Sequence, residues 1–130
     1  MILLDTHAVV WLMISPERVS KAATTAITRS IAEGNRPAVS SATIFEIAYG
    51  ARRGRILLHV TGSEFLDRLR SAFDLRPITE EIAFAAAAIP ERFHGDPLDR
   101  IIAATAKVDD LVLLTADSGI RRAGVCKTLW

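Results

Sequence analysis

Several features that define whole classes of protein are scarce in this sequence. Its 130 residues include one cysteine, Cys126, which excludes a disulfide framework and a zinc site built from cysteines. The formal net charge is only +1, from 16 basic and 15 acidic residues, so the chain lacks the broad basic surface of many nucleic-acid-binding proteins. Any site for a nucleic acid must therefore be local.

Long apolar runs are missing too. No stretch approaches the roughly 20 apolar residues that cross a membrane, and Asp5 interrupts the apolar N-terminus, which argues against a secretory signal. The sequence shows no repeat or linker, and 50% of its residues are hydrophobic, which excludes intrinsic disorder. We expect one cytoplasmic domain, residues 1–130, without a membrane partner.

What the sequence does contain is an alternation of short aliphatic runs and longer helical patterns. Strands are predicted at 2–4, 37–40, 75–78, 111–114 and 125–129. Helices are predicted at 6–13, 20–33, 41–53, 63–73, 79–90, 96–108 and 117–121, with a loop at 91–95 and no clear pattern at 56–60. Continuously apolar strands are typical of strands buried on both faces, so we predict an α/β sandwich with a mostly parallel sheet.

Acidic residues stand where these strands end. Asp5 follows the first strand directly, and Asp117 comes shortly after the fourth. Glu46 lies in the helix after the second strand, and Asp99 lies in the first turn of the helix that precedes the fourth. Since ligands of parallel α/β sheets bind beyond the carboxyl ends of the strands, we expect all four carboxylates to gather at one edge of the sheet.

Helix capping is an alternative interpretation for some of these acids. Asp5 and Asp117 each precede a helix, and Asp96 with Pro97 has the form of a helix start, so we assign Asp96 to capping alone. Glu46 is different, because it lies within a helix among apolar neighbours, where an acid without a partner is costly. Capping therefore does not account for the whole set.

Converging carboxylates need positive charge. Two of them about 4 Å apart repel by about 4 kcal/mol at an effective dielectric constant near 20. Arg100 could pair with one acid, but no neighbouring cation could neutralise them all. Such a cluster takes up protons or binds a cation, and carboxylates suit Mg²⁺ or Mn²⁺. Because these ions activate water and stabilise charge on phosphate, the residues predict metal-dependent hydrolysis of phosphodiesters.

Four segments together resemble the PIN-domain ribonucleases, specifically the VapC toxins of bacterial type II toxin–antitoxin modules. They are LLDTH at 3–7, FEIA at 45–48 with the basic tail RRGR at 52–55, DPLDRIIAATA at 96–106, and LLTAD at 113–117. The resemblance extends over essentially the whole chain. It implies a three-layer α/β/α sandwich with a five-stranded parallel sheet in the order 3-2-1-4-5.

The resemblance also implies roles for particular residues. It assigns metal binding and catalysis to four acids, of which the last is the least constant in the family: Asp5, Glu46, Asp99 and Asp117. It places two small hydroxyl residues beside them as supporting groups, Thr6 and Thr115, although turn capping explains both equally well. The implied cofactor is Mg²⁺, with Mn²⁺ as an alternative.

The implied partners are an RNA substrate, a second copy of the chain in a homodimer, and a cognate antitoxin. The C-terminal segment of the antitoxin would lie over the active site of a toxin–antitoxin hetero-oligomer. An acidic centre repels RNA, so a local basic rim is needed, and we assign part of the group Arg52, Arg53 and Arg55 to it, with a solvated surface as the alternative. Trp11 and Phe45 are assigned to the core or to an interface, with the stacking of a base by a single aromatic residue at a groove as the alternative.

We therefore predict a Mg²⁺-dependent endoribonuclease that acts as the toxin of a toxin–antitoxin module. One alternative is a binding module of the same fold with weak or lost catalysis, against which the presence of all four acids argues. A second alternative is a receiver-type signalling domain. That class needs a pair of adjacent acids after the first strand, where Asp5 stands alone.

Overall fold

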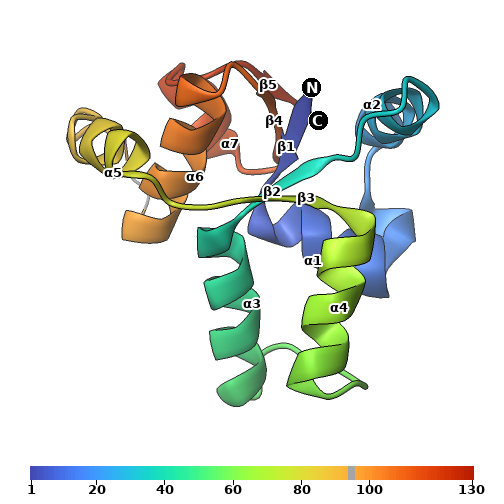
Figure 1. Ribbon diagram of the computed structural model, residues 1–130. Coiled ribbons are helices and arrows are strands. Elements are labelled where there is room, and N and C mark those ends of the chain that lie inside the picture. Colours follow the sequence, from blue (N-terminus) through green and yellow to red (C-terminus); the bar gives the residue numbers. More distant parts are fainter. Residues whose placement is uncertain (94–95) are drawn as a thin grey trace.

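The computed structural model describes residues 1–93 and 96–130 and centres on a five-stranded sheet. The strands are β1 (Ile2–Leu4), β2 (Ala38–Ser40), β3 (Asp74–Arg76), β4 (Val112–Leu114) and β5 (Thr128–Leu129). They lie in the order β3-β2-β1-β4-β5, and every neighbouring pair is parallel. The predicted sheet and its order are confirmed (Figure 1).

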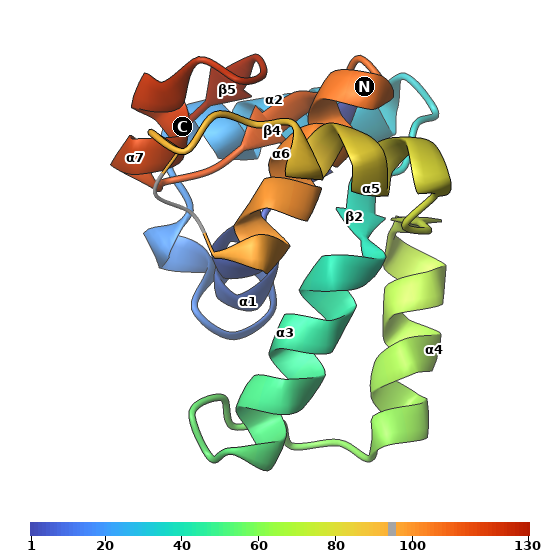
Figure 2. The ribbon, with the colours of Figure 1, turned by 90° about the vertical axis from the view of Figure 1, so that its left-hand side faces the viewer.

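Helices cover both faces of this sheet. They are α1 (Thr6–Ile14), α2 (Lys21–Ala32), α3 (Ser41–Arg52), α4 (Gly62–Ala72), α5 (Glu80–Ala87), α6 (Pro97–Val108) and α7 (Ser118–Ala123). In β1, Leu3 packs into an apolar core with α5, α6 and α7, whereas Ile2 and Leu4 pack into a second core with α1, α2 and α4. The result is the expected three-layer sandwich (Figures 1 and 2). Within the described residues, no helix is long and apolar enough to cross a membrane.

Some element boundaries differ from the prediction. The helix predicted at 63–73 begins one residue earlier, because α4 starts at Gly62 and its N-cap is Thr61. The Thr61 N–H donates to Glu64 Oε2 at 2.8 Å, and the Glu64 N–H donates to Thr61 Oγ1 at 3.3 Å. This reciprocal capping box favours the earlier start.

Three other segments also bear on the predicted elements: β3, the turn at 16–18 and the loop at 91–95. Strand β3 starts one residue earlier than the predicted 75–78 and ends two residues earlier, because only Asp74 to Arg76 pair in register with β2. A short 3-10 turn, η1 (Pro16–Arg18), was not predicted. Of the predicted loop at 91–95, residues 94 and 95 lie outside the described residues.

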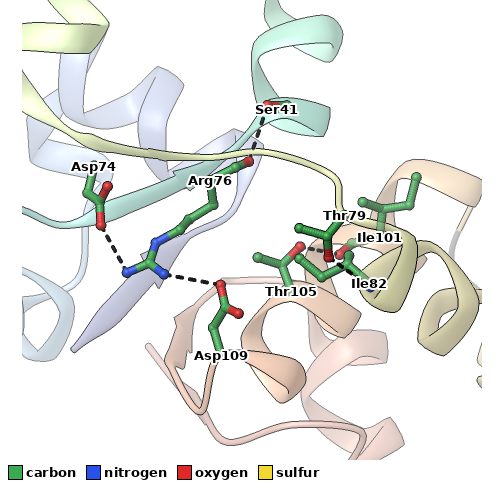
Figure 3. A network of polar contacts seen from close by, with 8 residues as sticks. All are labelled: Ser41, Asp74, Arg76, Thr79, Ile82, Ile101, Thr105 and Asp109. Atoms are coloured by element: carbon green, nitrogen blue, oxygen red, sulfur yellow. Dashed lines mark hydrogen bonds and ion pairs between the residues drawn. The ribbon is translucent and has the colours of Figure 1, made fainter.

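Arg76, at the end of β3, connects this edge strand to the end of α6 (Figure 3). Its guanidinium lies 2.9 Å from Asp74 Oδ2 and 3.3 Å from Asp109 Oδ2, and Asp109 is the C-cap of α6. Its backbone carbonyl accepts a hydrogen bond from Ser41 Oγ at 3.2 Å. Arg76 thus contacts both helices that carry predicted site acids, because Glu46 lies on α3 and Asp99 lies on α6.

Replacing Arg76 with methionine is expected to lower the free energy of unfolding by about 1–2 kcal/mol, because two partly buried carboxylates lose their common partner. The loss is moderated because Arg76 Nε is itself buried without a hydrogen-bond partner among the described residues. Denaturant unfolding measures the difference. Arg29→Met is the control, since its pair with Glu33 is exposed and should matter little. Equal losses in both variants would contradict this account.

Candidate active site

Asp5 is placed directly at the carboxyl end of β1, where it also caps α1. Its Oδ1 accepts a hydrogen bond from the Ala8 N–H at 2.7 Å, and only 6% of the residue is exposed. Burial raises the pKa of this carboxyl, and hydrogen bonds from the Thr115 side chain and from the Ala8 N–H lower it again in part. Capping, the alternative for Asp5, is therefore real, but it leaves a buried carboxylate at the sheet edge.

Glu46 projects from α3 toward the start of α1. Thr6 Oγ1 donates a hydrogen bond to Glu46 Oε1 at 2.7 Å and lies 3.3 Å from Thr43 Oγ1. Partial burial raises the pKa of Glu46, the Thr6 hydrogen bond lowers it, and the negative charges of Asp96 and Asp5 raise it further. Thr6 thus fixes the orientation of an acid that no backbone cap explains.

Asp99 has a carboxyl with a strongly raised pKa. It lies in the first turn of α6, and its pKa is raised to about 6, first by burial and then by repulsion from other acids. Those acids are, in order of effect, Asp96, Glu46, Asp117 and Asp5. The structure therefore brings the other three predicted acids, Asp5, Glu46 and Asp117, within electrostatic range of Asp99.

Thr115 and Asp117 follow the end of β4, at the same edge of the sheet as Asp5. Asp117 caps α7, with Oδ1 accepting from the Ile120 N–H at 2.9 Å. The Asp117 N–H donates to the hydroxyl of Thr115 at 3.1 Å, and Thr115 is fully buried. Since the Thr115 side chain also interacts with Asp5, one hydroxyl connects the acids that follow β1 and β4.

Two neighbours of Asp99 have other roles. Asp96 caps α6 as predicted, because its Oδ1 accepts from the N–H groups of Leu98 and Asp99, both at 3.0 Å. Arg100, which we expected could pair with an acid of the site, instead donates to the carbonyl of Ile89 at 2.7 Å and to two other carbonyls near the end of α5. Among the described residues, the acid that pairs with it is the exposed Glu91, at 3.9 Å. This cation therefore does not neutralise the acidic edge.

The donor set at this edge suits a hard divalent cation. It consists of carboxylates with nearby hydroxyls, and oxygen donors are what Mg²⁺ and Mn²⁺ prefer. The raised pKa values of Asp5, Glu46 and Asp99 reflect burial and mutual repulsion, both of which a bound cation relieves. Among the described residues, however, no three His, Cys, Asp or Glu side chains are close enough together to hold an ion as they stand. Sharing one ion would therefore require the carboxylates to move closer together.

A cavity of about 560 Å³ opens beside Glu46. Its lining includes the acids Glu46 and Asp96 with Thr6 and His7, and also Phe45, Tyr49, Arg53 and Arg55. Two of the three arginines assigned to RNA thus line the cavity, whereas Arg52, exposed at the end of α3, does not.

Phe45 does not belong to the core of this chain, because 55% of it is exposed, and of the two expected places only an interface stays a prediction. Helix α3 extends away from the sheet beside α4 (Figures 1 and 2), which leaves one face of α3 open. Tyr49, which shares this face, was missed by the sequence reasoning. Its spacing of four residues from Phe45 on a predicted helix was the available signal. Trp11 is half-buried and contacts Trp130.

An α/β protein with acids gathered at the carboxyl edge of a parallel sheet is the class that this fold and site define. The chain belongs to the PIN-domain family, whose model matches residues 2–125. The receiver-type alternative is thereby excluded. The chain is 36% identical over 120 residues to Ribonuclease VapC22 of Mycobacterium tuberculosis (strain ATCC 25618 / H37Rv). The matched segment covers 92% of this chain and 89% of that protein.

Solved structures show the same architecture. FitAcB from Neisseria gonorrhoeae is 25% identical, with a TM-score of 0.66 and coverage of 100% of this chain and 97% of that one. A chain of VapBC2 from Rickettsia felis, in a structure bound to a DNA fragment from the VapBC2 promoter, is 18% identical. The TM-score is 0.72, and the match covers 99% of this chain and 98% of that one. At 18% identity the likeness concerns the fold alone.

Proposed function

We propose that the protein is a divalent-metal-dependent endoribonuclease and the toxin of a toxin–antitoxin module. The observation that carries this proposal is the set of four acids at the sheet edge, three of them within electrostatic range of Asp99, in a chain 36% identical to a protein named Ribonuclease VapC22. The metal is Mg²⁺, with Mn²⁺ as the second candidate, since both accept carboxylate oxygens and work on phosphates.

Asp5, Asp99 and Glu46 are the residues that would hold the ion, aided by Asp117. When bound, the ion supplies an activated water molecule and neutralises charge that develops on the phosphodiester during in-line attack. Thr6 holds the Glu46 carboxylate in place through its 2.7 Å hydrogen bond. The Ala8 N–H and Thr115 do the same for Asp5, so these hydrogen bonds limit the orientations from which the carboxylates would close around an ion.

Arg53 and Arg55 offset the repulsion between the acidic edge and RNA. Both line the cavity that also contains Glu46, so they can contact phosphates next to the cleaved bond. Arg52 lies outside that cavity and contributes less to binding in this proposal.

The proposed protein partners are an antitoxin and a second copy of the chain. Structures with this fold include a toxin–antitoxin complex from Klebsiella pneumoniae, 23% identical with a TM-score of 0.70, which covers 100% of this chain and 97% of that one. That likeness supports a fold suited to such a complex. The antitoxin would inhibit the enzyme by covering the acidic edge.

Cleavage of RNA by the purified protein tests the proposal. We expect cleavage with Mg²⁺ or Mn²⁺, loss of cleavage with a chelator, and recovery when the ion is added back in excess. Cleavage that persists in a chelator would refute metal dependence. Titration with Mn²⁺ separates the remaining alternative, because a binding module without catalysis would show no metal affinity at the acidic edge.

Cleavage should also depend on pH through Asp99. The pKa of this carboxyl is raised to about 6, so the proportion of the negatively charged form, which binds the cation, falls as the pH is lowered through this value. We expect the Mg²⁺ concentration for half-maximal cleavage to rise by about fourfold as the pH is lowered from about 7.5 to about 5.5, because the ionised fraction of Asp99 falls by that factor. A constant requirement across this range would contradict the assignment of Asp99.

A further inference from the structure

Two aromatic side chains lie parallel on the open face of α3. The rings of Phe45 and Tyr49 are stacked, with centroids 5.6 Å apart and planes inclined by 8°. They remain exposed to 55% and 46%, respectively. Large aromatic side chains that are kept exposed in a group are typical of binding surfaces.

An arginine continues this row. Arg53 lies one turn after Tyr49, with its guanidinium carbon 5.8 Å from the ring centroid and its Nη1 3.3 Å from the Tyr49 hydroxyl. Phe45, Tyr49 and Arg53 are spaced four residues apart, so they form one stripe along the helix. We call these three residues the α3 stripe.

The α3 stripe borders the proposed active site. All three of its residues line the same cavity as Glu46 and Thr6, and Phe45 is the residue immediately before Glu46. Arg55 lies on the wall of the same cavity. The stripe therefore starts beside an acid of the site and leads away from it toward two cations.

We propose that Phe45 and Tyr49 form a stacking platform for an unpaired base of the RNA beside the cleaved phosphodiester, while Arg53 and Arg55 hold the adjoining phosphates. This assignment rests on the proposed ribonuclease function and names the residues that position its substrate. Proteins bind single-stranded nucleic acid by this combination of aromatic rings and cations, because every base has a face that stacks and every nucleotide carries a phosphate.

A protein partner fits the α3 stripe less well. Acidic residues are depleted at protein–protein interfaces, whereas here Glu46 directly follows Phe45 and, with Asp96, lines the same cavity. The stripe also leads into a cavity with acidic and basic walls, which is suited to a charged backbone. We therefore assign the surface to RNA and treat a second copy of the chain as a rival outcome.

Binding of a labelled single-stranded RNA that the wild-type protein cleaves tests the platform. The measurement is fluorescence anisotropy with Mg²⁺, in an Asp5→Asn background that prevents cleavage. Phe45→Leu keeps an apolar side chain but removes the aromatic face, and we expect the Kd to rise by about fivefold to a hundredfold. Phe45→Tyr should retain binding. Phe84→Leu is the matched control, because Phe84 is 80% exposed on α5 and should leave the Kd unchanged.

Three results would overturn the platform. The first is an unchanged Kd for both Phe45→Leu and Tyr49→Leu. The second is that these variants weaken binding of a fully paired duplex of the same sequence as much as binding of the single strand. The third is a lower molecular mass of Phe45→Leu by light scattering, with no change in the Kd of the remaining species. The last result would identify a second copy as the occupant. If the wild-type protein cleaves RNA and these results occur, this inference alone fails. If the wild-type protein neither binds nor cleaves RNA, the proposed function fails with it.

Discussion

Asp99→Asn is expected to lower RNA cleavage by at least about a hundredfold, because it removes a proposed metal ligand, and loss of an outer partner alone costs about tenfold to a hundredfold. Asparagine keeps the size of the side chain but not its charge. Initial cleavage rates at saturating Mg²⁺ and about pH 8, well above the pKa of Asp99, measure the effect. Raising the Mg²⁺ concentration should restore little of the rate if Asp99 also orients the ion.

The same substitution should stabilise the metal-free protein at neutral pH. The folded-state pKa of Asp99 is raised from 3.8 to about 6, so the folded state holds a proton that the unfolded state releases between these values. Its contribution to stability is present below about pH 4 and is lost as the pH rises to about 6. An asparagine side chain carries no such penalty, so thermal unfolding of the Asp99→Asn variant in a chelator at about pH 8 should occur at a higher temperature than that of the wild type.

Asp96→Asn is the matched control for this prediction. Asp96 lies three residues earlier and caps α6 with Oδ1, and asparagine is an equally good N-cap residue. We expect this variant to keep most of its activity. Equal losses in Asp96→Asn and Asp99→Asn would contradict the choice of Asp99 over Asp96, which rests on the position of Asp99 in the family pattern.

The sheet and the gathering of acids were predictable because their signals are local. Strands such as 112–114 are short and continuously apolar, and Asp5 and Asp117 stand beside strand ends, so parallel topology is enough to bring them together. The strand order came from the family resemblance rather than from the apolar pattern. The catalytic roles of the acids remain predictions.

Features that depend on packing between distant segments were not predictable in the same way. Arg100 donates to the carbonyls at the end of α5 rather than to the acids of the site. The sequence around Arg100 does not indicate these partners, because they belong to another helix. Phe45 is exposed because α3 leaves the sheet, whereas an apolar residue in a helix usually points inward. The Thr61 cap, by contrast, had a local signal in the T-x-x-E pattern with Glu64.

Thr115 was open to two interpretations in the sequence, turn capping and support of the site, and the structure gives it contacts of both kinds. It accepts a hydrogen bond from the Asp117 N–H at 3.1 Å, and its side chain also holds down the pKa of Asp5. A side chain of the same shape without the hydroxyl should therefore affect both stability and activity.

Thr115→Val is expected to lower the free energy of unfolding by about 1–3 kcal/mol, because a partly buried N–H loses its acceptor. RNA cleavage should fall by about tenfold to a hundredfold, since Asp5 loses the hydroxyl that helps to orient its carboxylate. Thr115→Ser keeps the hydroxyl and separates the two interpretations, because it should restore most of the cleavage even if the missing methyl group lowers stability. A Thr115→Val protein that unfolds more easily yet cleaves RNA and binds Mn²⁺ like the wild type would show that the hydroxyl only closes the turn. A joint loss of cleavage and Mn²⁺ affinity, restored by serine, would instead place Thr115 among the residues that position Asp5.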